Sequence, residues 1–477
     1  MRKTKIICTL GPAVDDADMI RTLIRTGMDA ARFNFSHGTH AEHLERLTRL
    51  KSIRDYMGRP VATILDTKGP EIRIKSFEEK SITLEAGDTF TLTTEDVVGN
   101  QSCVSVTYPK LHEELAPGQQ ILIDDGLVAI KVDRIEGSNI ICTVENGGTL
   151  SANKSINIPG VHIQLPALTE KDIEDIRFGV ENDFDFIAAS FVRRAADVEA
   201  VRAVLHECGG DDVKIIAKIE NQEGVDNLDE ILAVADSIMV ARGDLGVEIP
   251  AARVPILQKQ MIRKGLQAGK PVITATQMLD SMMRNPRPTR AEVSDVANAV
   301  YDGTSCVMLS GETAGGKYPV NALKAMVGIV TETESSIDYW EHFQQQTDPA
   351  ADINDAITHT CCLTARDLNA KAIISATNSG RSARMICRFH PACPIAALTM
   401  HEKVRRQLNI SWGVIPFLTG EVTSTDRIFS LATETAVKER LVQNKDVVVI
   451  TAGVPLGKSG FTNLIKAQVI DSDEDAM

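Results

Sequence analysis

Eight short apolar runs, each followed by polar or glycine-rich residues and then by a helical stretch, constrain the fold of this chain more than any other feature. The runs are Ile6 to Thr9, Ala30 to Phe35, Val61 to Leu65, Phe186 to Phe191, Val213 to Ile219, Ser237 to Ala241, Val272 to Ala275 and Cys306 to Leu309. Amphipathic stretches lie between them, such as Asp15 to Arg25, Ala41 to Tyr56 and Asp197 to Glu207. Eight buried strands that alternate with helices predict a closed (β/α)8 barrel. The pattern alone leaves a doubly wound open sheet as the alternative.

The alternation breaks once, between residues 71 and 166, where short strand-like stretches follow one another with almost no helical period. Dipeptides that favour turns, such as Asp125-Gly126 and Glu136-Gly137, separate these stretches. We therefore expect a small β-barrel domain inserted after the third barrel strand, where it would lie over the rim as a lid. The barrel itself is expected to comprise residues 1–70 and 167–340.

A further α/β domain is predicted at residues 353–477. A polar stretch from Glu341 to Asp352 is expected to be a linker. Alternation then resumes, and the stretch from Phe461 to Ile470 reads as extended chain rather than as a long helix. The strand-like runs are Ala372 to Ser375, Ile395 to Leu398, Val414 to Ile415 and Val447 to Thr451. This arrangement predicts an open α/β domain.

The acidic composition narrows the range of partners. With 51 Lys and Arg against 65 Asp and Glu, the formal net charge is -14, which argues against broad binding to nucleic acid or to an anionic membrane. An anionic small substrate is not excluded, because the field inside a cleft is local. We find no apolar run of about 18 residues and no signal segment. We therefore expect a cytoplasmic protein whose 9 cysteines are reduced.

Polar side chains gather where the predicted barrel strands end, which is the face of a β/α barrel that carries the active site. Glu220 and Asp244 follow successive strands, so their carboxylates can share one Mg²⁺. Lys218 lies two residues before Glu220 and faces the same way. Arg32 and Thr276 follow the same logic on the second and seventh strands. The joint occurrence of these ligands predicts a site for a cation and an anionic substrate.

Two further patterns do not support a site. His37, His40 and His43 have helical spacing without a carboxylate motif, so we expect a helix surface or a substrate contact rather than a metal site. The stretch from Gly453 to Ser459 resembles a P-loop, but its glycines are one residue too close together. We therefore do not expect a nucleotide-hydrolysing P-loop.

Several motifs together resemble the pyruvate kinase family over nearly the whole chain. They are Lys5-Ile6-Ile7-Cys8-Thr9-Leu10-Gly11-Pro12, Asn34-Phe35-Ser36-His37-Gly38, Leu65-Asp66-Thr67-Lys68-Gly69-Pro70-Glu71-Ile72-Arg73, Lys218-Ile219-Glu220-Asn221, Met239 through Pro250, Ala275-Thr276-Gln277-Met278-Leu279 and Asn285-Pro286-Arg287-Pro288-Thr289-Arg290-Ala291-Glu292. The resemblance implies transfer of a phosphoryl group from phosphoenolpyruvate to ADP, giving pyruvate and ATP, as the final step of glycolysis. It also implies Mg²⁺ (or Mn²⁺) and K⁺ as cofactors.

The resemblance assigns a role to each matching residue. Lys218, Arg32 and Thr276 match catalytic positions, and Arg32, Lys218, Gly243, Asp244 and Thr276 match substrate-binding positions. Glu220 and Asp244 match the Mg²⁺ ligands. Asn34, Ser36, Asp66 and Thr67 match the K⁺ ligands, and Arg73, Lys154, Asn34 and His37 match nucleotide contacts. Glutamate at position 71 is similar to the members of the family that require potassium, whereas a lysine there would replace the cation.

The C-terminal domain resembles the allosteric domain of this family. The resemblance implies a homotetramer and a phosphorylated sugar or nucleotide as the effector. The effector residues would be Thr377, Asn378, Ser379, Gly380, Arg381, Ser382 and Lys458, although the loop 377–382 alone also reads as a plain helix N-cap. Two other functions remain open: a Mg²⁺-dependent carbon–carbon lyase that acts through a pyruvate enolate, and a metabolite sensor without catalysis.

Overall fold

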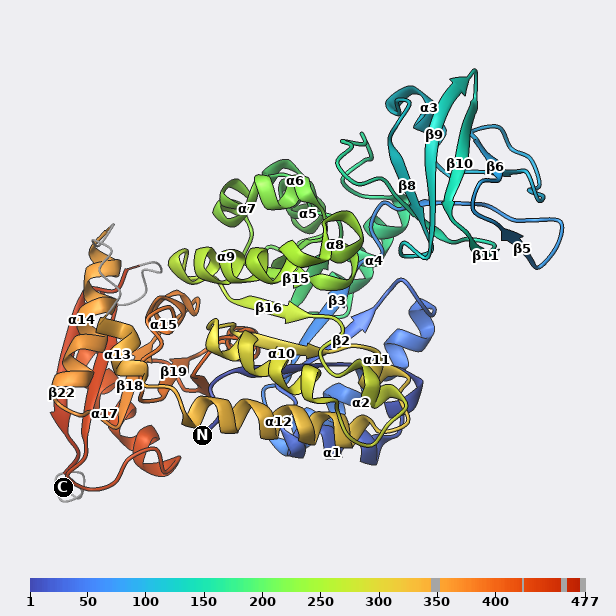
Figure 1. Cartoon of the computed structure of the whole chain (residues 1–477). Coiled ribbons are helices and arrows are strands. Elements are labelled where there is room, and N and C mark those ends of the chain that lie inside the picture. Colours follow the sequence, from blue (N-terminus) through green and yellow to red (C-terminus); the bar gives the residue numbers. More distant parts are fainter. Residues whose placement is uncertain (345–351, 423, 456–460, 472–477) are drawn as a thin grey trace.

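A closed barrel of eight parallel strands forms the centre of the molecule in the computed structural model, which describes residues 1–344, 352–422, 424–455 and 461–471 (Figure 1). Neighbouring strands follow the order β1-β17-β16-β15-β14-β13-β3-β2. The strands are β1 (Lys5–Thr9), β2 (Ala30–Asn34), β3 (Ala62–Asp66), β13 (Phe186–Ala189), β14 (Lys214–Ile219), β15 (Ser237–Ala241), β16 (Val272–Ala275) and β17 (Cys306–Leu309). The predicted barrel is confirmed, and the alternative of an open sheet is wrong.

Helices cover the outside of the barrel. They are α1 (Ala17–Thr26), α2 (His40–Met57), α4 (Glu170–Glu181), α5 (Ala195–Glu207), α7 (Leu228–Val234), α9 (Val254–Gln267), α10 (Arg290–Tyr301) and α12 (Pro319–Ser335). Three of them begin with a capping box, in which a threonine hydroxyl and an acidic residue three positions later satisfy each other's backbone N–H groups. The caps are Thr39, Thr169 and Thr289. These local signals fix where each helix starts after its strand.

The barrel has two separate apolar layers. One layer lies between strands and helices and includes Phe33, Leu65 and Ile219, which are fully buried. The other fills the barrel interior with side chains such as Ile64, Ile216 and Met308. Alternation along each strand sends successive residues to the two layers, so the polar residues that end the strands must lie on the rim.

The inserted unit follows β3 and is built almost entirely of strands. Its main sheet has seven strands in the order β4-β12-β8-β9-β10-β6-β7, and β5 (Ser81–Leu84) pairs with β11 (Gly148–Ser151). The seven strands are β4 (Ile72–Arg73), β6 (Thr89–Thr93), β7 (Cys103–Ser105), β8 (Gln120–Ile123), β9 (Val128–Glu136), β10 (Asn139–Asn146) and β12 (Ser155–Asn157), with one short helix, α3 (Leu111–Glu114). Backbone bonds from Lys75 N to Ser105 O (2.8 Å) and from Thr107 N to Arg73 O (2.9 Å) join the two edges, so the sheet curls into a barrel.

The C-terminal unit is an open sheet in the order β20-β19-β18-β21-β22. Its strands are β18 (Ala372–Ala376), β19 (Ile395–Thr399), β20 (Val414–Leu418), β21 (Val447–Ala452) and β22 (Leu464–Val469), and its helices are α13 (Tyr339–Gln344), α14 (Ile353–Asp367), α15 (Arg381–Cys387), α16 (Glu402–Leu408) and α17 (Thr425–Lys438). Extended chain near 461–470 is confirmed as β22, which pairs antiparallel with β21. The predicted linker is wrong for residues 341–344, which belong to α13, and residues 345–351 lie outside the described part.

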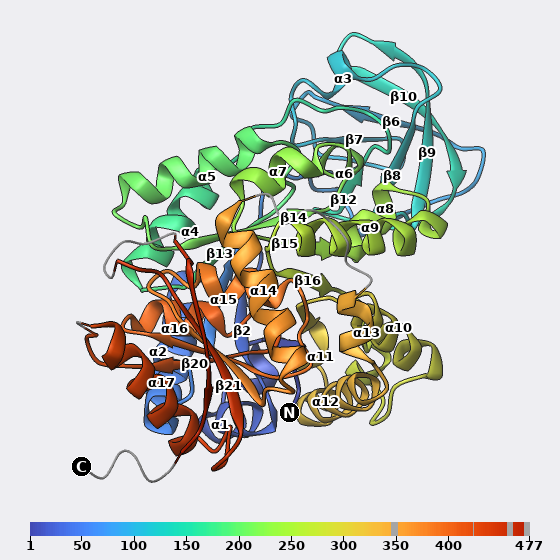
Figure 2. The ribbon, with the colours of Figure 1, turned by 90° about the vertical axis from the view of Figure 1, so that its left-hand side faces the viewer.

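The inserted unit and the C-terminal unit lie on opposite sides of the barrel (Figures 1 and 2). The C-terminal unit contacts the ends where the strands begin, because Lys5 Nζ donates to Val414 O at 2.7 Å and Arg406 forms an ion pair with the fully buried Asp185 at 2.8 Å. Ile410 joins the apolar cluster of the barrel interior. The opposite rim, where the strands end, faces the inserted unit.

Candidate active site

Asp66 contacts two positively charged side chains at the rim of the barrel. It ends β3, and its carboxylate accepts from Arg32 Nε at 2.6 Å and from Lys218 Nζ at 3.0 Å. Burial alone would raise the pKa of Asp66, but the Arg32 and Lys218 charges hold it below its ordinary value. Burial would likewise lower the pKa of Lys218, and the Asp66 and Glu220 carboxylates instead raise it. Asp66 and Lys218 are therefore both charged at neutral pH, and the structure brings the predicted residues Arg32, Asp66 and Lys218 together.

Glu220 and Asp244 follow adjacent strands, as predicted, but from different kinds of element. Glu220 comes directly after β14, whereas Asp244 lies in the first turn of α8 (Arg242–Glu248), which begins as soon as β15 ends. Burial raises the pKa of Glu220 to about 7, and Asp244 adds to this effect although Lys218 opposes it. Two neighbouring carboxylates, one of them buried, are the hard oxygen donors that suit Mg²⁺. The residues therefore fit a divalent cation.

Thr276 occupies an unusual backbone position at the end of β16. Thr276 and Gln277 both have positive φ, at 69° and 54°, a conformation that L-residues rarely adopt. The Thr276 hydroxyl donates to Ala275 O at 2.6 Å and accepts from Gly243 N at 2.7 Å. Arg242 donates to Thr276 O at 2.8 Å and is held by Asp295 at 2.7 Å. Sequence reasoning missed the role of Arg242 in supporting this turn, although its place between a strand and Gly243 was visible.

Ser190 is the second residue that sequence reasoning missed. It directly follows the end of β13 and is 6% exposed. Its hydroxyl accepts from Lys218 Nζ at 2.7 Å and donates to Thr67 O at 2.7 Å. The next residue, Phe191, donates its backbone N–H to Glu220 at 2.6 Å. The loop after β13 thus contacts three of the predicted site residues, and its position at a strand end was the available signal.

The predicted potassium ligands lie around the ends of β2 and β3. Asn34 and Asp66 are paired in the register of these two strands, and Thr67 comes next along the chain. Asn34 Oδ1 accepts from Ser36 N at 3.2 Å, and Ser36 is exposed. Amide, hydroxyl and carboxylate oxygens form a donor set that suits a hard cation. Asp66 is also the carboxylate that binds Arg32 and Lys218, so any cation there would share it.

The predicted nucleotide contacts from the inserted unit lie next to each other. Arg73 is in β4 and Lys154 immediately precedes β12, and Ile74 N donates to Lys154 O at 2.9 Å. Arg73 Nη2 contacts Glu71 at 2.6 Å, and Lys154 Nζ contacts Asp124 at 2.8 Å. Each of these two positively charged side chains is therefore paired with a carboxylate.

The three histidines near the start of α2 do not converge. His37 is exposed, and His40 contacts Asp175 at 2.6 Å. The expectation of a surface position is wrong for His43, which is 3% exposed and stacks on Phe35 with ring centroids 4.1 Å apart. A buried ring of this kind belongs to the core.

A cavity of about 170 Å³ lies where the inserted unit joins the barrel. Ile156, Ile158 and Val161 line it from one side, and Phe191 and Glu223 from the other. Asn157 Nδ2 donates to Glu248 at 2.9 Å across this joint. Burial raises the pKa of Glu248. Arg193 of the barrel also donates to Leu165 O at 2.8 Å, and His162 Nδ1 lies 3.2 Å from Glu223 Oε2, so several polar contacts tie the inserted unit to the rim at this point.

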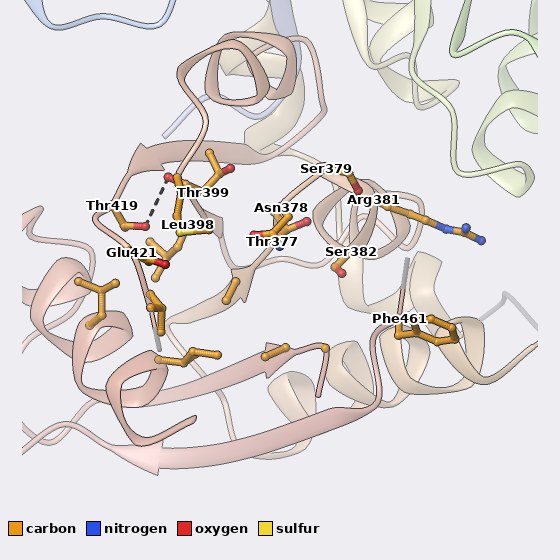
Figure 3. Close-up of a pocket in the computed structure, with 17 residues that line it drawn as sticks. Thr377, Asn378, Ser379, Arg381, Ser382, Leu398, Thr399, Thr419, Glu421 and Phe461 are labelled. Carbon is orange, nitrogen blue, oxygen red and sulfur yellow. Dashed lines mark hydrogen bonds between the residues drawn. The ribbon is translucent and has the colours of Figure 1, made fainter. Parts of the chain in front are cut away.

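A second cavity, of about 180 Å³, lies in the C-terminal unit (Figure 3). Of the predicted effector residues, Thr377, Asn378, Ser379, Arg381 and Ser382 line it, while Gly380 forms the turn behind them with φ of 79°. Arg381 extends away from the other labelled side chains, and Glu421 lies on the opposite wall from the loop. Lys458 lies outside the described residues, as do residues 456–459 of the P-loop-like stretch from Gly453 to Ser459.

Comparison with known proteins decides the family. Residues 1–323 match the family model for the pyruvate kinase barrel domain, and residues 355–468 match the model for the pyruvate kinase alpha/beta domain. The chain belongs to the pyruvate kinase family. It is 49% identical over 473 residues to the pyruvate kinase of Clostridium acetobutylicum, covering 99% of this chain and 100% of that protein. These matches identify a phosphotransferase family and give no support to the carbon–carbon lyase.

Further relatives agree with this result. The pyruvate kinase of Geobacillus stearothermophilus is 49% identical over 472 residues, which span 98% of this chain and 80% of that protein. The crystal structure of a pyruvate kinase from Cryptosporidium parvum superimposes with a TM-score of 0.94 at 40% identity, covering 98% of this chain and 96% of that chain. Among the described residues, we find no helix long and apolar enough to cross a membrane.

Proposed function

We propose that this chain transfers the phosphoryl group of phosphoenolpyruvate to ADP, giving pyruvate and ATP. The observation that carries the proposal is the cluster at the rim, in which Lys218 Nζ lies 3.0 Å from both Asp66 and Glu220 and Arg32 joins the same Asp66 carboxylate. Phosphoryl transfer needs positive charge around the transferring oxygens and little covalent chemistry from the protein. Lys218 and Arg32 supply that charge from a buried, preorganised position.

Glu220 and Asp244 would hold Mg²⁺ or Mn²⁺, and Asn34, Ser36, Asp66 and Thr67 would hold K⁺. The bound cations would neutralise charge on the phosphate and on the carboxylate of the substrate. Gly243, in the first turn of α8, leaves room beside Asp244 for the substrate carboxylate. Thr276 lies beside Gly243 and orients the enolate end, since its hydroxyl is already in a hydrogen-bonded chain.

Arg73, Lys154, Asn34 and His37 would contact the nucleotide. Arg73 and Lys154 belong to the inserted unit, residues 71–166, which we propose to act as a lid over the barrel of residues 1–70 and 167–340. Closing the lid would exclude water and bring these two cations toward the phosphates. The Asn157–Glu248 contact is one of several polar contacts at the joint, and closing the lid would rearrange it.

The C-terminal domain, residues 353–477, is proposed to bind a phosphorylated sugar or nucleotide that activates the enzyme. The cavity of about 180 Å³, lined by four hydroxyl or amide side chains of the loop 377–382, supports this assignment. Lys458, which follows β21 in the sequence, would contribute to the same site. We further propose a cytoplasmic homotetramer, in keeping with allosteric members of the family.

One assay tests the central proposal. Pyruvate formation from phosphoenolpyruvate and ADP is measured with Mg²⁺, with and without K⁺, across a panel of sugar phosphates and nucleotides. Pyruvate and ATP in equal amounts would support the kinase, and an effector in the panel would lower the phosphoenolpyruvate concentration at half-saturation. No turnover under any of these conditions would overturn the proposal.

A further inference from the structure

The ammonium group of Lys218 is fully occupied by acceptors in this structure. It lies 3.0 Å from Asp66 Oδ1, 3.0 Å from Glu220 Oε1 and 2.7 Å from Ser190 Oγ. Lys218 is 8% exposed, so bulk water has little access to it. An ammonium group has three N–H donors, and the described residues offer three acceptors at hydrogen-bond distance. A substrate oxygen can therefore reach Lys218 only when one of these acceptors releases it.

Two of the three acceptors have a second role under the proposed function. Asp66 is a proposed K⁺ ligand and Glu220 a proposed Mg²⁺ ligand. A carboxylate that binds a metal cation holds the Lys218 ammonium less well, because the ammonium and the metal ion are both positive and repel each other across so short a distance. Lys218 would then lose its hold on both carboxylates as the site fills. Ser190 is the neutral acceptor, and nothing assigns its hydroxyl to a cation.

Ser190 is itself held from several sides. Its hydroxyl has one proton, and Thr67 O at 2.7 Å is a closer acceptor than Asp66 Oδ1 at 3.4 Å. The proton therefore points to Thr67 O, which leaves a lone pair facing Lys218. Its backbone N–H donates to Thr67 Oγ1 at 3.3 Å. Gly69, with φ of 75°, packs so closely that an added Cβ would lie 2.7 Å from Ser190 Cβ. The side chain therefore has little freedom to turn away.

We propose that Ser190 is a positioning residue for phosphoryl transfer. Resting on the proposed function, the inference is that its hydroxyl keeps the Lys218 ammonium in place while the two carboxylates turn to their cations. Through Thr67, the same hydroxyl links the position of Lys218 to the proposed potassium site. The side chain must accept and donate at once, which alanine cannot do and which a thiol does weakly.

The test compares Ser190→Ala and Ser190→Cys with a matched control. Ser237→Ala removes another buried serine, which is 1% exposed and whose hydroxyl has no partner among the described residues. Ser237 is the first residue of β15 and so lies at the end of the barrel away from the rim that carries the site. We expect Ser190→Ala to lower kcat by about tenfold to a hundredfold, the range for one lost hydrogen bond to a charged group. Ser190→Cys should fall between wild type and Ser190→Ala, and Ser237→Ala should match wild type.

Two readouts separate positioning from a merely structural role. The K⁺ concentration at half-maximal rate should rise at least threefold in Ser190→Ala, while KM for ADP stays near its wild-type value. Calorimetric titration of phosphoenolpyruvate with Mg²⁺ and no ADP should show the same shift in K⁺ dependence without turnover. Unchanged K⁺ dependence in both measurements, or a wild-type kcat in Ser190→Ala, would overturn the inference. Failure of the proposed function would look different, because wild-type protein would then form no pyruvate.

Discussion

His390 is a buried histidine whose neutral form the fold requires, and this gives a prediction for stability against pH. Its ring stacks on Trp412 with centroids 3.8 Å apart, and its Nε2 atom has no partner among the described residues. Burial lowers its pKa to about 3, with smaller contributions from Lys3 and His342, against an ordinary value of 6.5. Protonating this ring in the folded protein would place a charge between the C-terminal unit and the barrel.

The pH dependence of the folding stability follows from the difference in proton binding between the folded and unfolded protein. Because the folded pKa is depressed, the unfolded chain binds a proton that the folded protein does not, at every pH between about 3 and 6.5. Stability is therefore complete above pH 6.5 and falls as the pH drops toward 3. At pH 5.0 the loss amounts to ~2 kcal/mol, and at pH 7.5 it is close to zero.

The assay is urea unfolding followed by tryptophan fluorescence, at pH 7.5 and pH 5.0. The chain has 2 tryptophans, Trp340 and Trp412, and both lie on the C-terminal side, so the signal reports on that unit. His390→Asn removes the titrating ring, and asparagine tolerates the φ of 47° found there. Wild type should lose ~2 kcal/mol more than the variant between the two pH values. Equal losses in both proteins would refute the reasoning.

Three further predictions concern the site. Lys218→Met should lower turnover by at least ~10³-fold while Mg²⁺ binding, measured by calorimetry, changes little, and a near-normal rate would exclude Lys218 from the mechanism. Glu71→Lys should reduce the K⁺ requirement of the steady-state rate, and a variant that still needs K⁺ for full rate would contradict our account of position 71. Asn157→Ala should raise KM for ADP about threefold to tenfold by freeing the lid from Glu248, whereas Asn182→Ala, on the barrel exterior, should not. Equal KM values would argue against this contact as a lid bond.

The barrel was predictable because its signal is periodic. All eight strands were placed within two residues at each end by apolar runs, since both faces of a barrel strand are buried and the run is uninterrupted. The strand ends then placed Lys218, Glu220 and Arg32 on one rim. The strands of the inserted unit were also predictable, but the backbone bonds that join its edges at Lys75 and Thr107 were not, because contacts between strands far apart in the chain leave no local pattern.

The supporting residues were not predictable from the same signal. Arg242 supports Thr276 only because two successive residues adopt left-handed φ values, a choice that tertiary contacts impose on residues that do not favour it. His43 was expected on a surface because its spacing is that of any helix face, and only the packing of Phe35 decides otherwise. A local sequence pattern predicts the helix or strand in which a residue lies. The residue's contact partners depend on tertiary packing, which a local pattern does not show.

The buried charges of the rim cluster are better explained by the proposed function than by the stability of the fold. Replacing a buried ion pair by apolar residues of similar volume is often neutral or stabilising, so the fold alone does not call for Lys218, Asp66 and Glu220 together. Glu220 is the clearest sign, since burial raises its pKa to about 7 even with Lys218 beside it. Lys218 and the Phe191 N–H both contact this carboxylate, yet they do not offset its burial and the charge of Asp244. A divalent cation would remove that deficit, and the same event would release Lys218 toward the substrate, leaving Ser190 to hold it.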